Sequence, residues 1–263
     1  MRPLSAFEQD RTLRSPRGLL FDLDDTLLTH GQLTREAYGA LWDLHRAGFL
    51  LVAVTGRPSG WGEVLVRQWP IDAAVTENGA VHLVRKGNVV AVRERCTAEE
   101  RHRRRMRLAQ LVTRVAEVVP EARLADDVSA RRSDVAWDIG ERVRLPTDRI
   151  DLIAREIVAV GARTTRSSVH LHATFDEDDK ASGSVELLAR EFGVDQGVAL
   201  RTFAFVGDSG NDAACFAAFD TTFGVANIAA YVPRLSIPPR YVAPSAMGAG
   251  FAEIARVLVH SRS

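Results

Sequence analysis

Short runs of apolar residues alternate along the first part of the chain with longer segments in which apolar and polar positions follow a helical spacing. Such runs occupy 18–21, 49–54 and 71–75, and a helix over 34–47 is predicted between the first two, with Thr34 as its N-cap. Continuous apolar strands separated by helices are typical of a parallel sheet that is buried on both faces. The first part of the chain therefore predicts an α/β fold.

The pattern changes near residue 81. A β-hairpin is predicted over 81–92, and a long amphipathic helix begins at the capping box of residues 97–100. A strand at 135–139, a helix over 147–160 and a strand over 164–173 follow. This mixture predicts a small α+β domain inserted into the first one.

Strands and helices alternate again from about residue 180. The predicted elements are a helix over 182–192, a strand at 203–206, a short helix at 212–219, a strand at 221–225 and a closing helix over 250–259. We therefore expect a Rossmann-like, doubly wound parallel sheet whose core is formed by two pieces of chain. The expected limits are a polar N-terminal tail at 1–16, a core at 17–81 and 174–263, and an inserted domain at 82–173.

The composition agrees with a folded intracellular protein. Of 263 residues 46% are hydrophobic and 26% charged, and 34 basic residues balance 34 acidic ones, which argues against a disordered chain and against long-range attraction to polyanions. The longest apolar run, 49–54, is far below the roughly 18 residues that a membrane helix needs. Residues 1–16 have no apolar segment of a signal peptide, and Cys96 and Cys215 are too few for a disulfide framework. We expect a cytoplasmic protein that contacts no membrane, with both cysteines reduced.

The first chemical signal is Asp22-Leu23-Asp24-Asp25-Thr26, which stands where the first strand ends. Ligands of doubly wound sheets bind at that edge. Two carboxylates two residues apart can both reach one site, one as a nucleophile or metal ligand and the other as a proton carrier. A plain acidic turn would explain the same letters.

Three further segments follow strands or begin a helix. Gly207-Asp208-Ser209-Gly210-Asn211-Asp212 combines a tight turn with carboxylates of the kind that Mg²⁺ prefers, although a glycine turn with an Asp cap would also fit. Thr55-Gly56-Arg57 offers a hydroxyl, a flexible backbone and a positive charge to a phosphate, or is only a turn. Lys180 is one of only two lysines in an arginine-rich chain, which favours a role that needs a compact ammonium over a surface ion pair.

The four segments together, in this order and at successive sheet edges, resemble the haloacid dehalogenase superfamily of phosphohydrolases. The resemblance covers 17–81 and 174–263 by motif, and the insertion by position and pattern. An α+β insertion there looks like the type C2 cap of subclass IIB, which includes Cof-like, sucrose-phosphate and trehalose-phosphate phosphatases and phosphomannomutases. The segment 207–212 looks most like sucrose-phosphatase-like members. Asp25 stands where many relatives have glycine, and we give it no role.

The resemblance implies a role for each matching residue. Asp22 would be the nucleophile that takes the phosphoryl group, and Asp24 would be the general acid and base. Thr55 and Lys180 would bind phosphoryl oxygens. Mg²⁺ would be held by Asp22, by the backbone carbonyl of Asp24 and by Asp208, with Asp212 supporting the metal or Lys180.

Other polar residues are weaker candidates for substrate binding. His170 and His172 share one face of a predicted strand that leads from the insertion to the core. They could simply be exposed to solvent; if this face instead looks into a cleft between insertion and core, they would be specificity residues. Glu77-Asn78-Gly79 lies at the first crossover into the insertion, where a plain turn is an equally good interpretation. Gly56 and Arg57 are candidates because a flexible backbone and a fixed positive charge beside Thr55 suit phosphate oxygens.

We therefore predict a Mg²⁺-dependent phosphatase that acts on a small phosphorylated metabolite, a sugar or polyol phosphate, through an aspartyl-phosphate. One alternative is a phosphosugar mutase, which would need a bisphosphate activator. The other is a polyanion-binding module that uses the arginine-rich segment 101–107, but the apolar stripe after it makes these arginines the solvated face of a helix, so nucleic acid is not the expected partner. The sequence leaves the substrate and the oligomeric state open.

Overall fold

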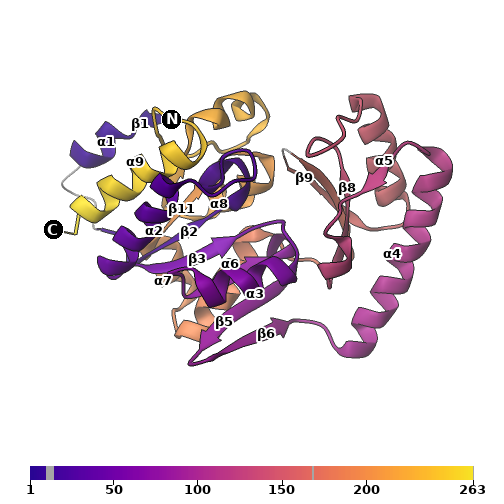
Figure 1. Ribbon diagram of the computed structural model, residues 1–263, viewed down its shortest axis with the longest axis horizontal. Helices are drawn as coiled ribbons and strands as arrows, with labels where there is room; N and C mark the ends of the chain where they lie inside the picture. Colours follow the sequence, from indigo (N-terminus) through magenta and orange to yellow (C-terminus); the bar gives the residue numbers. More distant parts are fainter. Residues whose placement is uncertain (10–14, 168, 263) are drawn as a thin grey trace.

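The computed structural model describes residues 1–9, 15–167 and 169–262 and contains a core and an inserted domain, the cap (Figure 1). The core sheet has the following strands in spatial order: β1 (Arg2–Pro3), β13 (Tyr241–Val242), β12 (Thr221–Gly224), β11 (Phe203–Gly207), β2 (Gly18–Phe21), β3 (Leu50–Val54), β4 (Ala73–Thr76), β5 (Val81–Lys86) and β6 (Val89–Glu94). Neighbours from β1 to β4 are parallel, whereas β5 and β6 are antiparallel. The expected doubly wound parallel sheet is confirmed.

Helices cover both faces of this sheet. One face carries α1 (Ser5–Gln9), α2 (Arg35–Arg46), α3 (Ser59–Gln68) and α9 (Met247–His260), and the other carries α6 (Lys180–Phe192), α7 (Gln196–Thr202) and α8 (Ala213–Ala218). Successive residues of a strand point to opposite faces, so Leu19 and Phe21 pack with the first group and Leu20 with the second. The sheet is therefore buried on both sides, as its continuous apolar strands predicted.

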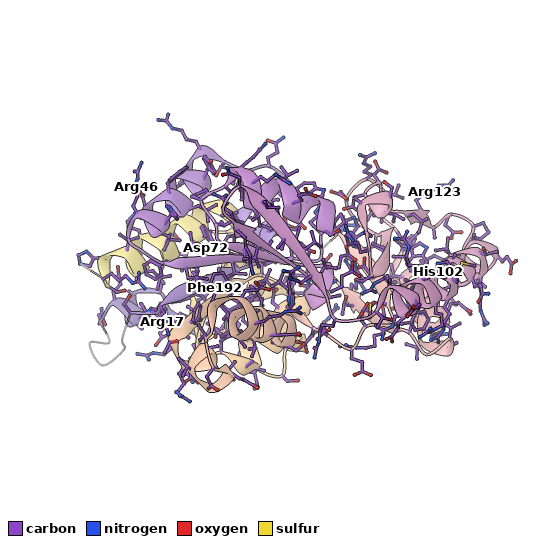
Figure 2. The ribbon with its side chains drawn as sticks, turned by 90° about the horizontal axis from the view of Figure 1, so that it is seen from below. Arg17, Arg46, Asp72, His102, Arg123 and Phe192 are labelled. Atoms are coloured by element: carbon purple, nitrogen blue, oxygen red, sulfur yellow. The ribbon has the colours of Figure 1, made fainter. Side chains whose placement is uncertain are left out.

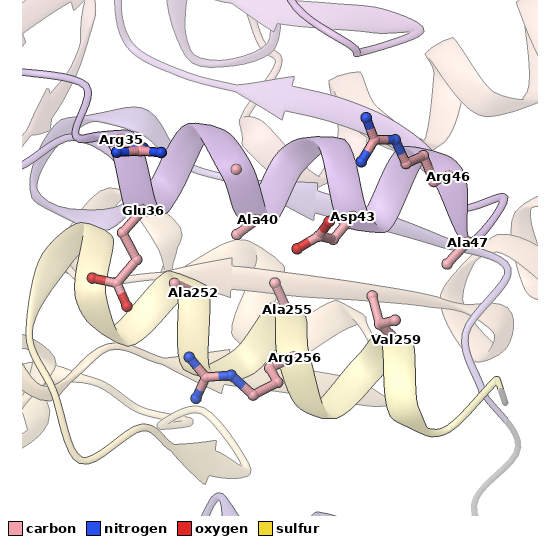
Figure 3. Close-up of a pocket in the computed structure, with 11 residues that line it drawn as sticks. Arg35, Glu36, Ala40, Asp43, Arg46, Ala47, Ala252, Ala255, Arg256 and Val259 are labelled. Atoms are coloured by element: carbon pink, nitrogen blue, oxygen red, sulfur yellow. The ribbon is translucent and has the colours of Figure 1, made fainter.

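A groove of ≈ 780 Å³ lies between α2 and α9 on the core (Figure 3). Its floor consists of small residues such as Ala40, Ala252 and Ala255, and charged side chains stand at its rim. In Figure 3, Glu36 and Asp43 extend from α2 toward α9. None of the motif residues lines this groove, so it is separate from the candidate site.

The cap is a sheet with two helices on its outer face. Its elements are α4 (Ala98–Val118), β7 (Arg123–Leu124), β8 (Asp134–Asp138), α5 (Thr147–Ala159), β9 (Arg163–Arg166) and β10 (His170–Thr174), with the antiparallel strands in the order β7-β8-β10-β9. Leu171 and Ala173 face an apolar core shared with α4 and α5. His170 and His172 alternate with them and therefore lie on the opposite face of the cap sheet. Figure 1 shows that this sheet lies between the cap helices and the core.

Three details differ from the sequence-based expectations. The hairpin of β5 and β6 extends the core sheet, so residues 82–94 lie with the core and not with the insertion. The N-terminal residues, expected as a polar tail, pair β1 with β13 and bury Leu4 and Phe7, while residues 10–14 of that segment lie outside the described residues. The single strand expected over 164–173 is a hairpin of β9 and β10.

Two further expectations concern the surroundings of the protein. Across residues 1–9, 15–167 and 169–262, each helix is too short or too polar to cross a lipid bilayer. Cys96 and Cys215 are not bonded to each other, and Cys215 is buried.

Candidate active site

The central strands β2 and β11 bring the aspartates of two motifs together at one edge of the sheet. Asp22 directly follows β2, and its backbone N–H donates to the Val206 carbonyl of β11 over 3.0 Å. The chain then turns tightly through Leu23–Leu27, where Asp25 adopts a left-handed φ of 56°. Asp208 directly follows β11, so Asp22 and Asp208 leave neighbouring parallel strands at the same end.

Lys180 is the buried cation of this cluster. It is the first residue of α6, whose N-terminus is fixed by a capping box between Asp179 and Ser182. Its Nζ lies 2.5 Å from Asp22 Oδ1 and 2.7 Å from Asp212 Oδ1, and its side chain is fully buried. The other carboxylate oxygen of Asp212 accepts hydrogen bonds from the backbone N–H groups of Asp208 and Ser209, at 2.9 and 3.1 Å.

Negative charge exceeds positive charge in this cluster. Burial raises the pKa of Asp22 to about 7, although Lys180 acts in the opposite sense. Burial and the charge of Asp22 raise the pKa of Asp208 well above its usual range. Burial by itself would lower the pKa of Lys180, but Asp212 and Asp22 outweigh it and raise that pKa.

The cluster has the donor set of a divalent metal site. Asp22, Asp208 and Asp212 each offer one carboxylate oxygen within 4.8 Å of the others, and all three residues are buried. Hard carboxylate oxygens suit Mg²⁺ and similar cations, and one ammonium leaves part of the charge of three carboxylates uncompensated. A divalent metal fits these residues.

Asn227 orients Asp208 from the next strand along the sheet. It follows β12, and its Nδ2 donates to Asp208 Oδ2 over 2.9 Å and to the Asp25 carbonyl over 3.0 Å. The Thr26 hydroxyl donates to the other oxygen of Asp208 over 3.2 Å. Asn227 was not among the sequence-predicted site residues, although its position just beyond a strand was a signal that could have found it.

The segment after β3 lies on the other side of Asp22. Thr55 is fully buried, and its hydroxyl oxygen accepts from the Arg57 N–H over 3.0 Å. Arg57 makes a two-pronged contact with Asp24, with Nε and Nη2 at 2.9 and 2.8 Å from its carboxylate oxygens. A Cβ added to Gly56 would lie 3.2 Å from His172 Nε2, so glycine here allows the cap to approach closely.

A small cavity of ≈ 10 Å³ separates the cap from these residues. It is lined by Asp22, Asp24, Gly56, Ser167, His170, His172, Ser209 and Asn211. A volume of this size holds about one water molecule. In Figure 2, polar side chains fill the space between the core, with the labelled Asp72 and Phe192, and the cap, with Arg123 and His102. The structure therefore has its cap closed on the core.

Both cap histidines are buried at this cavity, which corrects their interpretation as solvated strand positions. His170 and His172 are each only 2% exposed. His170 Nε2 lies 2.9 Å from Glu141 Oε2, and Glu141 also accepts from Arg57 Nη2 over 2.9 Å. These contacts with His170 and then Arg57 lower the pKa of Glu141 to about 2. His172 Nδ1 lies 2.9 Å from Asp134 Oδ2, and burial lowers the pKa of this histidine.

The Glu77-Asn78-Gly79 segment lies beside the cavity without lining it. The Glu77 carboxylate contacts the cap backbone, and Asn78 Oδ1 accepts from Asn211 Nδ2 over 3.4 Å. Gly79 packs on the start of α6, where an added Cβ would lie 2.2 Å from the Asp179 carbonyl oxygen. Sequence reasoning missed the cap residues Glu141, Asp134 and Arg131, because only the folded cap brings them to this interface.

Four arginines of the segment 101–107 have partners within the protein. Arg101 donates to Glu94 and Asp176, at 2.7 and 2.8 Å, and Arg104 also reaches Asp176 at 2.6 Å. Arg105 donates to the Arg131 carbonyl, and Arg107 lies over the Phe175 ring. These contacts join α4 to the two crossovers between core and cap.

The fold and the site define a capped α/β protein with a carboxylate and lysine centre at the carboxyl edge of its sheet. The family model of haloacid dehalogenase-like hydrolases matches residues 19–102. This match covers the first part of the core and agrees with the resemblance seen in the motifs. A comparison with curated proteins finds no significant match.

Solved structures share the fold over nearly the whole chain. The C-terminal domain of a C. albicans trehalose-6-phosphate phosphatase has a TM-score of 0.71 at 11% identity and covers 99% of this chain and 98% of its own. The sucrose-phosphatase of Synechocystis sp. PCC6803 gives 0.61 at 17%, with 93% and 98% covered. A sugar phosphatase of haloacid dehalogenase subclass IIB gives 0.60 at 17%, with 86% and 93% covered. At these identities the likeness establishes the fold alone, a core with an inserted cap.

Proposed function

We propose that the protein is a Mg²⁺-dependent phosphatase that hydrolyses the phosphate ester of an uncharged sugar or polyol through an aspartyl-phosphate on Asp22. The observation that carries this proposal is the position of Lys180 Nζ, 2.5 Å from Asp22 and 2.7 Å from Asp212, inside a cluster of three buried carboxylates. Burying three carboxylates and an ammonium costs folding free energy, and such arrangements are typical of functional sites. Phosphoryl transfer needs cations that compensate the charge of the phosphate, and Lys180 supplies one.

The first chemical step uses the two aspartates of the first motif. A carboxylate oxygen of Asp22 attacks phosphorus, the bond from phosphorus to the leaving oxygen breaks, and Asp24 gives its proton to that oxygen. In the second step, Asp24 takes a proton from water, the water oxygen attacks phosphorus, and the Asp22 carboxylate leaves. Lys180 and the Thr55 hydroxyl donate to phosphoryl oxygens in both steps.

The metal would be held by Asp22 and Asp208 and by the Asp24 carbonyl, with Asp212 directing Lys180. Bound Mg²⁺ supplies positive charge that lets an anionic nucleophile approach an anionic phosphate. Asn227 and Thr26 fix the carboxylate of Asp208, and Lys180 holds Asp22 toward the same centre. These contacts prepare the carboxylates before substrate binds.

The charges at the cap face favour a neutral leaving group. Beside the cavity, the acidic side chains Glu141, Asp127 and Asp134 face two cations, Arg57 and Arg131, which they already engage. A carboxylate on the leaving group would meet this excess of negative charge, whereas hydroxyls can both donate and accept. His170 and Ser167, which line the cavity, would contact such hydroxyls.

A panel of phosphate esters tests the proposal. We expect Mg²⁺-dependent phosphate release from hexose and polyol phosphates, and much less from 3-phosphoglycerate and nucleotides. Equal or faster release from the carboxylate-bearing ester would contradict the assignment of a neutral leaving group. Absence of release from every ester, with the fold intact, would contradict the phosphatase.

A further inference from the structure

The Glu77–Gly79 turn connects β4 to β5 in an unusual backbone conformation. Glu77 and Asn78 have φ values of 52° and 55°, and Gly79 follows at 119°. Residues other than glycine rarely adopt a positive φ, and such backbone strain persists where the surrounding contacts hold the residue in place. The conformation places the Glu77 carboxylate at the interface with the cap, although the residue belongs to the core.

The Glu77 carboxylate receives hydrogen bonds from both domains. From the cap, Oε2 accepts the N–H groups of Arg132, Ser133 and Asp134, at 3.0, 2.5 and 3.3 Å, and the Ser133 hydroxyl at 2.7 Å. From the core, Oε1 accepts the Ser59 N–H at 3.1 Å. Glu77 is only 2% exposed, so these protein donors replace water around its charge.

The cap segment that binds Glu77 also positions the cap side of the cavity. Arg131 Nη1 donates to the Gly56 carbonyl of the core over 3.0 Å and to Asp134 over 3.0 Å. Asp134 in turn holds His172, which lines the cavity. Docking of residues 131–134 on Glu77 therefore fixes where His172 stands relative to Asp22.

The closed cap has to open in each catalytic cycle. A cavity of ≈ 10 Å³ cannot admit a sugar phosphate, so substrate enters and product leaves only after core and cap separate. Separation breaks the contacts of Glu77 with 132–134, and water then solvates both its carboxylate and the freed N–H groups. Closure reverses this exchange.

We propose that Glu77 is a positioning residue that latches the cap: its carboxylate binds the backbone of 132–134 in the closed state and releases it when the cap opens. The inference rests on the proposed function for its role in turnover, but the latch itself is a property of the two domains. Glu77 touches no reacting atom and acts through the cap segment that carries His172.

Hydrogen exchange and small-angle X-ray scattering of Glu77→Gln test the latch without a substrate. An amide side chain keeps the size of Glu77 but replaces one acceptor oxygen by an NH2 group, which carries two donors, at a place where several donors converge. We expect the amides of 132–134 to exchange at least about tenfold faster, because hydrogen bonds to a charged group are lost, and the scattering to shift toward a more extended shape. The exchange of α5 should not change.

Glu63→Gln is the matched control, because Glu63 is an exposed residue of α3 that pairs with the exposed Arg67 in a contact of 2.9 Å. It should behave as wild type in both measurements. Ser133→Ala removes one donor and leaves the three N–H groups, so it should move the exchange in the same direction by less. This variant keeps the test decisive if Glu77→Gln fails to fold.

Kinetics separate the latch from the proposed reaction. With glucose 6-phosphate or whichever ester of the panel is cleaved fastest, Glu77→Gln should lower kcat/KM at least about tenfold, with a smaller effect on p-nitrophenyl phosphate, whose leaving group needs no cap contacts. Wild-type exchange and scattering in Glu77→Gln would overturn the latch. Faster exchange at 132–134 in Glu77→Gln, together with a wild type that cleaves no ester, would support the latch and overturn the phosphatase.

Discussion

Replacement of Gly183 by alanine tests how closely α6 has to approach the Glu77–Gly79 turn. A Cβ on Gly183 would lie 2.4 Å from the Gly79 carbonyl oxygen and 2.6 Å from its Cα, where ordinary contacts begin at 3.4 Å. Both neighbours are backbone atoms, so α6 has to move by about 1 Å to relieve the overlap. Lys180 stands one helical turn earlier and moves with the helix.

The displacement should affect activity more than stability. A misplacement of about 1 Å at reacting groups can cost about 100-fold in rate, so we expect kcat for phosphate release to fall by that factor. Overpacking lowers the free energy of unfolding by about 1–3 kcal/mol, while alanine in place of a helical glycine returns about 1 kcal/mol. Steady-state kinetics and urea denaturation measure the two effects.

Gly39→Ala is the matched control, because Gly39 lies in the middle of α2 and a Cβ there would meet no atom within 4 Å among the described residues outside its own helix. This variant should keep the wild-type kcat and gain up to about 1 kcal/mol of stability from helix propensity. If Gly183→Ala behaved like Gly39→Ala in both assays, the argument that this glycine contact positions Lys180 would be refuted.

Three further predictions concern charge. Burial lowers the pKa of His82 to about 4 against 6.5 in the unfolded chain, so the unfolded state binds more protons between these pH values. The free energy of unfolding should therefore fall by up to about 3 kcal/mol as the pH drops from 6.5 to 4. Denaturation at pH 4.5 and 7.5 should show less of this loss in His82→Leu. Lys180→Arg should lower phosphate release at least about 100-fold because a planar guanidinium does not fit between the buried carboxylates. Lys86→Arg, which changes an exposed lysine paired with Glu191, should match wild type. Saturating Mg²⁺, at about 100 times its Kd, should stabilise the wild type by about 2.7 kcal/mol in thermal denaturation, and Asp208→Asn should lose this gain; an equal gain in the variant would argue against the metal site.

The core was predictable because local patterns and topology act together there. Continuous apolar runs fixed which segments are buried strands, and the alternation with helices made them parallel. Parallel strands end at the same edge, so Asp22, Thr55 and Asp208 had to gather once the strands were identified. Lys180 was found through its rarity in the sequence and through the capped helix that it begins.

The cap interface was not predictable, because its contacts join residues distant in sequence through side chains of ordinary type. His170 and His172 looked solvated, since strand alternation shows that they share a face but not what that face meets. Glu77 contacts residues more than fifty positions away, and its left-handed backbone has no signature in the sequence. The β5 and β6 hairpin was expected correctly but assigned to the wrong domain, because a hairpin pattern does not reveal which sheet edge it extends.

Phosphate release by wild type, Asp22→Asn and Asp25→Asn tests the central claim most directly. Asp25 is the matched control, since it is a carboxylate three positions further along the same turn and is not one of the three carboxylates of the cluster of Asp22, Asp208 and Asp212. With Mg²⁺ and the best ester of the panel, we predict release by wild type and Asp25→Asn and none above background by Asp22→Asn. Release by a folded Asp22→Asn at the wild-type rate would contradict the assignment of Asp22 as the nucleophile.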